Sequence, residues 1–254
     1  MFEPNRNLGQ NFLTDFHVAS IMVDALDIQQ NDTIVEIGPG LGAITIQLAN
    51  TLTSSESKIY VVEVDERFIP KLNQMLKEHL NTQVVFANFL DWLPMINIQD
   101  KFKILGAIPF NITTPIVNTI LHLQNQPETC VLMVQDEVAK KLTAAPPDSS
   151  FWSVFVQSFY DVEYLGSVEK EKFDPAPSFN GGIVKLNKKQ TTEITFDQLQ
   201  KYEGFLHRGF SNPRKMLNKI FTEEEIQKIN FNGSDRAENI SAQHWTEAFK
   251  KLLL

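Results

Sequence analysis

The chain has 254 residues, of which 43% are hydrophobic and 21% charged, and its formal net charge at pH 7 is -8. No apolar run approaches the roughly 20 residues that span a bilayer, so the sequence predicts a globular protein and excludes a membrane segment. The acidic balance argues against a protein that coats nucleic acid over its whole surface, although it is compatible with a local basic face. Met1 to Gln10 shows neither the apolar core of a signal peptide nor an Arg-rich presequence, so the expected location is the cytoplasm.

Strand-like and helix-like patterns alternate along the first part of the chain. Short apolar runs predict buried strands, and apolar residues at helical spacing predict amphipathic helices. Strands are expected at 33–37, 58–64, 84–87, 102–106 and 131–135, and helices at 18–26, 44–52, 68–80, 115–122 and 137–144. Repeated strand-helix units indicate an α/β fold, with a mostly parallel sheet that is covered by helices on both faces.

The pattern changes to short strand-like runs over 151–186, and two of these runs, 162–168 and 182–186, predict an antiparallel edge of the same sheet. The polar segment 187–195 has the composition of a linker. Helices are expected beyond it, at 196–210, 214–220, 223–229 and 244–253. We therefore expect two domains, 1–188 and 196–254, of which the second is small and helical.

A glycine-rich turn follows the first expected strand, in the segment Glu36-Ile37-Gly38-Pro39-Gly40-Leu41-Gly42. Such a turn lets the backbone approach a ligand and points helix N–H groups at it, although glycine-rich turns also serve as tight connections. Glu63 ends the next strand, where a carboxylate either accepts both ribose hydroxyls of an adenosine or caps a helix. With Pro39 inside the turn and Gly42 closing it, the pattern favours S-adenosylmethionine over a nicotinamide cofactor. The neighbouring Asp65 has no assigned role.

Basic residues gather in one part of the expected helical domain. Between 201 and 219, only Glu203 opposes the basic residues Lys201, Arg208, Arg214, Lys215 and Lys219. Such a cluster is more often a solvated helix face than an RNA-binding surface, and both interpretations stay open. No metal site is expected, because the five histidines are scattered without ligand spacing.

Further motifs run from residue 7 to residue 241. They are Asn7-Leu-Gly-Gln-Asn-Phe-Leu, Ile108-Pro109-Phe110-Asn111 with Thr114-Pro115, Gln135-Asp-Glu-Val-Ala, Phe173-Asp-Pro-Ala-Pro-Ser, Phe210-Ser-Asn-Pro-Arg-Lys-Met-Leu and Arg236-Ala-Glu-Asn-Ile-Ser. In this order the sequence resembles the ribosomal RNA adenine N6-dimethyltransferases, a family that includes small-subunit dimethyladenosine transferases and erythromycin-resistance methylases. The resemblance implies a Rossmann-like class I methyltransferase sheet in 1–188, which binds S-adenosylmethionine, and a helical RNA-binding domain in 196–254.

The resemblance also implies roles for single residues. In the family, an aromatic residue stacks on the target adenine, while an Asn side chain and a Pro carbonyl accept hydrogen bonds from its amine. Phe110 and Pro109 retain the aromatic surface and the carbonyl, and a core position for Phe110 is the alternative. The implied cofactor residues are Gln10, Asn11, Leu13, Glu36, Gly38, Gly40, Gly42, Glu63, Asn88 and Ala107, and the implied RNA residues are Phe110, Asn111, Phe173, Lys201, Arg208, Arg214 and Lys215.

Two positions depart from the family's pattern. Ala107 stands where the family has the catalytic asparagine, so no acceptor remains there, and we expect the rate to be lower by about 10²- to 10³-fold. Asn88 stands where the family has an aspartate that accepts from the cofactor's adenine amine, and we expect this change to weaken binding by about 1 kcal/mol. Asn88 as a simple turn residue is the alternative.

These features predict an enzyme that transfers methyl groups from S-adenosylmethionine to N6 of adenine in structured ribosomal RNA. The target base must be flipped or already unpaired to reach the site. The expected partner is a pre-ribosomal small subunit, and the chain is expected to act as a monomer. Two alternatives stay open: a ribosome-assembly or mitochondrial transcription factor of the same fold with little or no turnover, and a methyltransferase for a different substrate.

Overall fold

The computed structural model describes residues 3–96, 98, 100–212 and 214–253, and the chain forms two compact units. The first unit comprises Met1–Ala139 and Glu163–Asn187, and the second comprises Lys140–Val162 and Lys188–Leu254. The segment 140–162 is thus grouped with the C-terminal helices, while the domain boundaries at 188 and 196 stay a prediction. The outer ends of the two predicted domains, Met1 and Leu254, and Pro213 of the motif at 210–217 lie outside the described residues.

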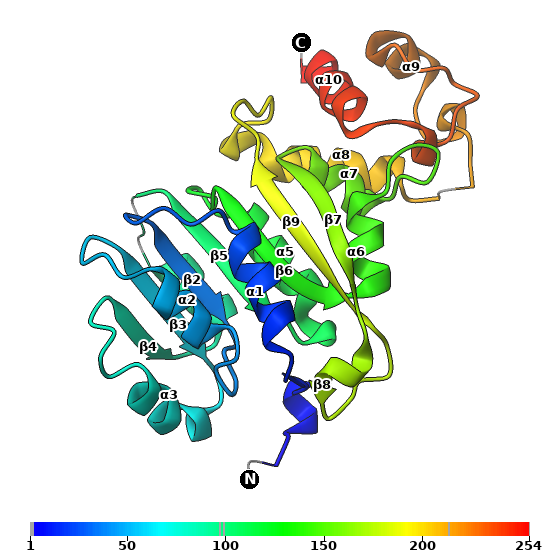
Figure 1. Ribbon diagram of the computed structural model, residues 1–254. Coiled ribbons are helices and arrows are strands. Elements are labelled where there is room, and N and C mark those ends of the chain that lie inside the picture. The colour runs from blue at the N-terminus through cyan, green and yellow to red at the C-terminus, as the bar shows by residue number, and fades with distance from the viewer. Residues whose placement is uncertain (1–2, 97, 99, 213, 254) are drawn as a thin grey trace. The chain divides into compact units, whose positions relative to one another are not determined.

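In the described part of the chain, seven strands form one sheet with the order β4-β3-β2-β5-β6-β9-β7 (Figure 1). The strands from β4 to β6 are parallel, and β9 pairs with β6 in the antiparallel direction. The bounds are β2 Thr33–Ile37, β3 Lys58–Glu63, β4 Thr82–Phe86, β5 Phe102–Ala107, β6 Thr129–Gln135, β7 Tyr160–Val168 and β9 Gly181–Lys188. The predicted α/β fold with an antiparallel edge is confirmed.

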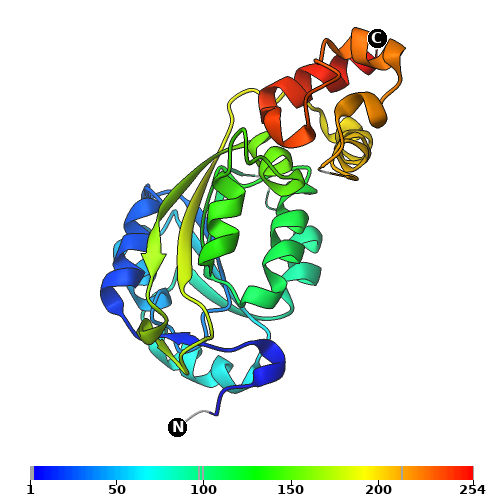
Figure 2. The same ribbon diagram turned by 90° about the vertical axis from the view of Figure 1, so that its right-hand side faces the viewer.

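Helices cover both faces of the sheet, with α1 and α2 on one face and α5 on the other (Figures 1 and 2), and α4 packs against α5. Helix α1 begins where the Asp15 carboxylate accepts hydrogen bonds from the backbone N–H groups of His17 and Val18. Its buried residues recur at helical spacing and pack into the main core cluster. The helices associated with this sheet are α1 Phe16–Ala25, α2 Thr45–Thr51, α3 Ile69–Met75, α4 Phe89–Met95, α5 Thr113–Leu121 and α6 Asp136–Thr143.

The sheet changes its direction of growth between β2 and β5. From β2 the chain adds β3 and β4 on one side, and it then returns to add β5 and β6 on the other side. Open α/β sheets bind ligands outside the carboxyl ends of the strands at such a switch point. The glycine turn at 38–42 leaves β2 here, and the segment 108–111 leaves β5 beside it. The topology therefore brings two of the predicted motifs to one place.

A small second sheet holds the N-terminal motif. Strand β1 (Phe12–Leu13) pairs antiparallel with β8 (Phe173–Asp174), so residues about 160 positions apart in the chain are neighbours. The Lys172 carbonyl also accepts a hydrogen bond from the Thr14 N–H at 2.9 Å. This pairing places the motif at 7–13 next to the proline loop at 173–178.

The second unit contains α7 Phe151–Gln157, α8 Leu199–Gly209, α9 Glu223–Ile229 and α10 Ala242–Leu253. Aromatic side chains form its core: Tyr202 and Trp245 are fully buried, and the Tyr202 ring lies 5.2 Å from that of Phe249. The Tyr202 hydroxyl is 2.7 Å from the Ser158 hydroxyl, which gives its polar end a buried partner. Single 3₁₀ turns complete the two units, at Arg6–Leu8, Glu66–Phe68, Phe110–Ile112, Lys170–Lys172, Phe196–Gln198, Leu217–Lys219 and Ala237–Asn239.

Residues 151–157 form helix α7, so the expectation of strand-like structure is wrong there. Ser150 Oγ accepts from the Ser153 N–H at 3.1 Å, and Ser153 Oγ accepts from the Ser150 N–H at 2.8 Å, which makes a capping box. Phe151 and Phe155, one turn apart, stack with their centroids 5.5 Å apart. Capping and this contact along the helix outweigh the β propensity of an aromatic run.

Three other element predictions need correction. The predicted helix 214–220 is only a 3₁₀ turn in its described residues, because the N–H groups of Leu217 and Asn218 donate to the carbonyls of Asp235 and Gly233. The predicted helix 68–80 ends early, since α3 stops at Met75. Helix α4 was not predicted, because it is short and contains a proline.

Candidate active site

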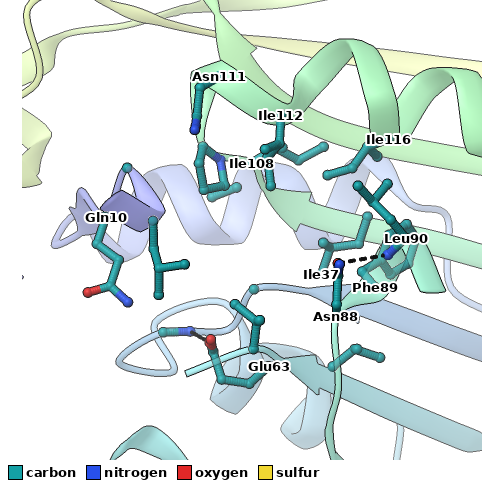
Figure 3. A pocket seen from close by; sticks show the side chains of 18 of the residues that line it. Gln10, Ile37, Glu63, Asn88, Phe89, Leu90, Ile108, Asn111, Ile112 and Ile116 are labelled. Atoms are coloured by element: carbon teal, nitrogen blue, oxygen red, sulfur yellow. Dashed lines mark hydrogen bonds between the residues drawn. The ribbon is translucent and has the colours of Figure 1, made fainter. Parts of the chain in front are cut away.

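A cavity of about 280 Å³ opens at the switch point, lined by the N-terminal motif at 7–12 and by residues at the ends of β2, β3, β4 and β5. In Figure 3, Glu63 lies between Gln10 and Asn88, and isoleucine side chains form an apolar wall above them. Among the predicted site residues, the cavity brings together Gln10, Asn11, Gly38, Gly40, Glu63, Asn88, Ala107, Pro109, Phe110 and Asn111. Residues from five separate segments thus meet around one space.

The glycine turn adopts a backbone that favours glycine. Gly38, Gly40 and Gly42 have φ values of 61°, 53° and 88°. At Gly40 a Cβ would also come within 3.0 Å of the Phe12 ring. Gly42 lies deeper, where its N–H donates to the Pro39 carbonyl at 2.8 Å and a Cβ would collide with the Met75 side chain. The contacts of Gly42 are those of turn packing, and its contact with a cofactor stays a prediction.

Glu63 is held against the glycine turn by backbone groups. Its Oε2 accepts from the Gly40 N–H at 3.1 Å, and its Oε1 accepts from the Asp65 N–H at 2.8 Å. Burial raises the pKa of this carboxyl, while the backbone hydrogen bonds oppose the rise. Each carboxylate oxygen still has a lone pair for another donor. The site therefore presents a fixed acceptor to hydroxyl groups.

Glu36 lies beneath the turn and is almost completely buried. Its Oε1 accepts from the Thr45 hydroxyl at 3.0 Å, while Oε2 has no hydrogen-bond partner among the described residues. Burial raises the pKa of Glu36 to about 8, and the nearby Glu63 adds to the rise. Glu36 and Leu13 line a separate small cavity of about 40 Å³ under the glycines. Their contact with a cofactor stays a prediction.

The N-terminal motif is tied down by Asp65 and Arg67, a pair that we call the clasp. Gln10 Nε2 donates to Asp65 Oδ2 at 2.8 Å, and the Arg67 guanidinium donates to both oxygens of Asp65. Arg67 also donates to the Glu3 carbonyl at 3.1 Å. The hydrogen bond from Arg67 lowers the pKa of Asp65 to about 2. Local sequence patterns assign no role to Asp65, because a contact between positions 10 and 65 has no local signal.

Asn88 is the N-cap of helix α4. Its Oδ1 accepts from the Leu90 N–H at 3.1 Å, as Figure 3 shows, and its Nδ2 donates to Asp91 Oδ2 at 2.9 Å. Since Asn88 also lines the cavity, the alternative of a turn residue and the cofactor role are compatible. A hydroxyl or amide oxygen at an N-cap keeps a second lone pair for another donor.

The loop after β5 carries the predicted catalytic residues. Ala107 ends the strand and lines the cavity with a methyl group, and Pro109 and Phe110 follow in a 3₁₀ turn whose Ile112 N–H donates to the Pro109 carbonyl at 3.1 Å. Phe110 is not buried in the core, which argues against the core alternative. Gly9 packs closely against this loop, because a Cβ at this position would lie 2.8 Å from Asn111 Oδ1. The φ of Gly9, 64°, also favours glycine. The N-terminal motif thus lies directly against the catalytic loop.

A second, wider cavity of about 1000 Å³ adjoins the first and shares Gly9, Gln10, Asn11, Phe110 and Asn111 with it. The proline loop supplies another part of its lining, from Pro175 to Phe179. Phe173, the predicted substrate residue, is only 7% exposed and packs in the core, whereas Phe179 is 59% exposed. Sequence reasoning missed Phe179, although an aromatic residue two positions after the Pro-x-Pro segment was the available signal.

The predicted basic residues lie in the second unit. Lys201, Arg214 and Lys215 are exposed. Arg208 donates to both oxygens of Glu225 at 2.6 and 2.7 Å, and its guanidinium lies 4.5 Å from the centroid of the Phe221 ring. This hydrogen bonding lowers the pKa of Glu225 to about 2. Arg208 therefore has a structural contact that balances its charge, and RNA contacts for all four residues stay predictions.

The groups around the first cavity fit S-adenosylmethionine in their chemistry. A Cβ at Gly38 would meet no atom within 4 Å, so the turn opens onto free space. Glu63 offers carboxylate oxygens suited to ribose hydroxyls, and Asn88 offers an amide oxygen suited to an adenine amine. Isoleucine side chains supply apolar walls for the base.

Among the described residues, no group of three His, Cys, Asp or Glu side chains is arranged to hold a metal ion. Within the same residues, no helix is long and apolar enough to span a membrane.

The sequence matches the family described as ribosomal RNA adenine dimethylase over residues 1–253. Among curated proteins, ribosomal RNA small subunit methyltransferase A from a Sulfurihydrogenibium species is 34% identical, covering 97% of this chain and 95% of that relative. The protein of the same name from Persephonella marina is 31% identical, covering 100% of this chain and 95% of that relative.

Two solved structures share the fold across almost the whole chain. The 23S rRNA methyltransferase ErmE is 24% identical with a TM-score of 0.77, covering 96% of this chain and 100% of that chain. A dimethyladenosine transferase from Plasmodium falciparum is 21% identical with a TM-score of 0.80, covering 95% of this chain and 97% of that chain. At these identities the likeness establishes the fold of the chain.

Proposed function

The chain belongs to the ribosomal RNA adenine dimethylase family, and from this premise we propose that it transfers methyl groups from S-adenosylmethionine to N6 of adenine in structured ribosomal RNA. One observation carries the proposal: the cavity at the glycine turn and the wider cavity at the proline loop share a rim of five residues. Methyl transfer needs a donor and an acceptor within near-attack distance, and two adjoining cavities with a common rim meet this need.

When bound, S-adenosylmethionine supplies a methyl group that is already activated by the sulfonium. The chain's own residues have to orient a poor nucleophile, since the lone pair of the adenine amine is delocalised into the ring. Phe110, on the shared rim, offers a ring face on which an unpaired base stacks. The Pro109 carbonyl accepts one hydrogen bond from Ile112 and has a second lone pair for the amine.

Ala107 limits this arrangement. Its methyl group lines the first cavity where the family's asparagine would offer a second acceptor to the amine. Loss of one preorganised acceptor lowers a rate by about 10²- to 10³-fold. The proposed enzyme is therefore slow compared with a chain that has asparagine at this position.

The RNA partner is proposed to be the small ribosomal subunit or its precursor, in line with the names of the two curated relatives. The exposed residues Lys201, Arg214 and Lys215 are proposed to contact the RNA backbone. We further propose that the chain acts as a monomer in the cytoplasm.

The test compares the wild-type chain with Ala107→Asn, using labelled S-adenosylmethionine and under-methylated small ribosomal subunits. We expect adenine methylation to rise by about 10²- to 10³-fold in the variant. Ala107→Leu is the matched control, because leucine has nearly the size of asparagine and no acceptor. The enzyme proposal fails when neither the wild type nor Ala107→Asn methylates adenine in any ribosomal RNA.

A second candidate function is favoured by the same alanine: a cofactor- and RNA-binding assembly factor with little turnover. Calorimetry separates the candidates. Binding of S-adenosylmethionine and of ribosomal subunits, without methylation in either chain, supports the binding protein. Absence of S-adenosylmethionine binding overturns the cofactor assignment for both.

A further inference from the structure

We propose that Asp91 is a specificity-determining residue for the adenine of the cofactor, because it orients the amide of Asn88. The inference rests on the proposed function, in which the adenosine of S-adenosylmethionine lies beside Asn88 in the first cavity. Asp91 lies in the first turn of helix α4, where its Oδ2 accepts a hydrogen bond from the Asn88 Nδ2.

The orientation of the amide follows from its two partners. The Leu90 backbone N–H is 3.1 Å from Oδ1, and the Asp91 carboxylate is 2.9 Å from Nδ2 (Figure 3 shows the first contact). A backbone N–H only donates and a carboxylate only accepts, so each end of the amide faces its one compatible partner. If the amide were turned over, its NH₂ group would face the Leu90 N–H, which is also a donor. Its oxygen would face the Asp91 carboxylate, which is also an acceptor.

This orientation matters because an amide is ambiguous where an aspartate is not. An aspartate offers only acceptors and selects a base with an exocyclic amine, as in adenine. An asparagine selects either that amine or, when turned over, the oxygen of a 6-oxo purine. Asp91 holds the nitrogen of Asn88, so that the oxygen remains available to the base. The pair Asn88 and Asp91 thereby recovers the one-sided recognition of a single aspartate.

The carboxylate has a second effect on the same oxygen. Donation from Nδ2 to a negative group polarises the amide and increases the electron density on Oδ1. The second lone pair of Oδ1 then becomes a better acceptor for the adenine amine. Both residues are exposed in the structure, so we expect an effect of severalfold and not of many orders of magnitude.

The experiment measures the binding of two probes by calorimetry, S-adenosylhomocysteine and S-inosylhomocysteine, which differ at position 6 of the purine. In Asp91→Ala, we expect the preference for the adenosyl probe to fall about threefold to tenfold compared with the wild type. Asp91→Asn is the conservative variant and keeps a carbonyl acceptor for Nδ2, so its preference should lie between the two. Glu56→Ala is the matched control, because it removes an exposed carboxylate just before β3, at the amino end of that strand and away from the cavity.

The effect of Asp91→Ala on binding of the adenosyl probe should have the opposite sign in the variant Asn88→Asp. In Asn88→Asp, two carboxylates face each other, so adding Asp91→Ala should strengthen binding of the adenosyl probe by about threefold or more. A role of Asp91 in helix α4 alone would weaken both probes equally and would give the same sign in both backgrounds; either result overturns the inference. Absence of binding by the wild-type chain overturns the proposed function and this inference with it. Wild-type binding with an unchanged preference in Asp91→Ala overturns the inference alone.

Discussion

Thr45 donates a hydrogen bond of 3.0 Å to one carboxylate oxygen of Glu36, and the other oxygen of this buried carboxylate has no partner among the described residues. A buried charge without full hydrogen bonding is costly, so the group keeps its proton to a higher pH. The pKa of Glu36 rises from 4.5 to about 8 with burial as the main cause. The stability of the first unit should therefore depend on this residue in the neutral pH range.

Glu36→Gln should remove part of the pH dependence of stability. The unfolded chain releases the Glu36 proton above pH 4.5, whereas the folded chain keeps it to about pH 8, so the stability contribution is full below 4.5 and falls as the pH rises to 8. Glutamine has no proton to lose. We expect the variant to gain on the order of 4 kcal/mol relative to the wild type between pH 5 and pH 8.5, because each pH unit between the two pKa values contributes about 1.4 kcal/mol. Thermal unfolding across this range measures the gain, and parallel curves for both chains would contradict it.

Arg67→Ala should loosen the N-terminal motif. The clasp residue Asp65 has a pKa of about 2 because of its hydrogen bond with Arg67, below its ordinary 3.8. Its contribution to stability is therefore present above pH 3.8 and is lost as the pH falls through 2. Because Arg67 is exposed and water screens the pair, we expect only a small loss of stability at pH 7, which shrinks toward pH 2.

The same variant should make the segment before residue 10 more accessible to proteases, which limited proteolysis followed by mass spectrometry measures. Arg67→Lys keeps the charge without the paired donors and should give an intermediate result. Equal cleavage of wild type and Arg67→Ala would show that the clasp does not hold the motif.

Phe173→Ala and Phe179→Ala should separate stability from substrate binding. Phe173 is 7% exposed in the core, so its removal should cost about 3 kcal/mol of unfolding free energy. Phe179 is 59% exposed at the wider cavity, so its removal should leave the melting temperature unchanged. If it stacks on the flipped base, RNA affinity should fall by roughly 1 kcal/mol, or about fivefold. A filter-binding assay and thermal unfolding on both variants test this division, and a large loss of stability in Phe179→Ala would refute it.

Gly209→Ala should destabilise the second unit. A Cβ at Gly209 would collide with Cη2 of the buried Trp245 ring, and the indole has little space to move. We expect a loss of about 2 kcal/mol from overpacking. Gly204→Ala is the matched control in the same helix, because a Cβ there meets no atom within 4 Å and alanine favours the helix by about 0.5 to 1 kcal/mol. Denaturant unfolding of both variants should therefore show opposite signs.

The alternation of strands and helices was predictable because it depends on local periodicity. The strand 33–37 and the turn after it were placed correctly, since a short apolar run ending in glycines has few other conformations. The helix at 151–157 was predicted wrongly, because its aromatic residues favour a strand and the capping box at Ser150 stabilises a helix instead.

The sequence by itself determined the α/β fold and the position of the glycine turn, because these depend on residue type and on spacing along the chain. The two departures at Asn88 and Ala107 also follow from the sequence, but only through its resemblance to the family's motifs. Only the tertiary structure decided that Phe179 and not Phe173 faces the wider cavity, that Arg208 pairs with Glu225, and that Asp65 holds Gln10. Each of these is a contact between residues brought together by packing or a choice between two similar side chains, and neither is encoded in local periodicity.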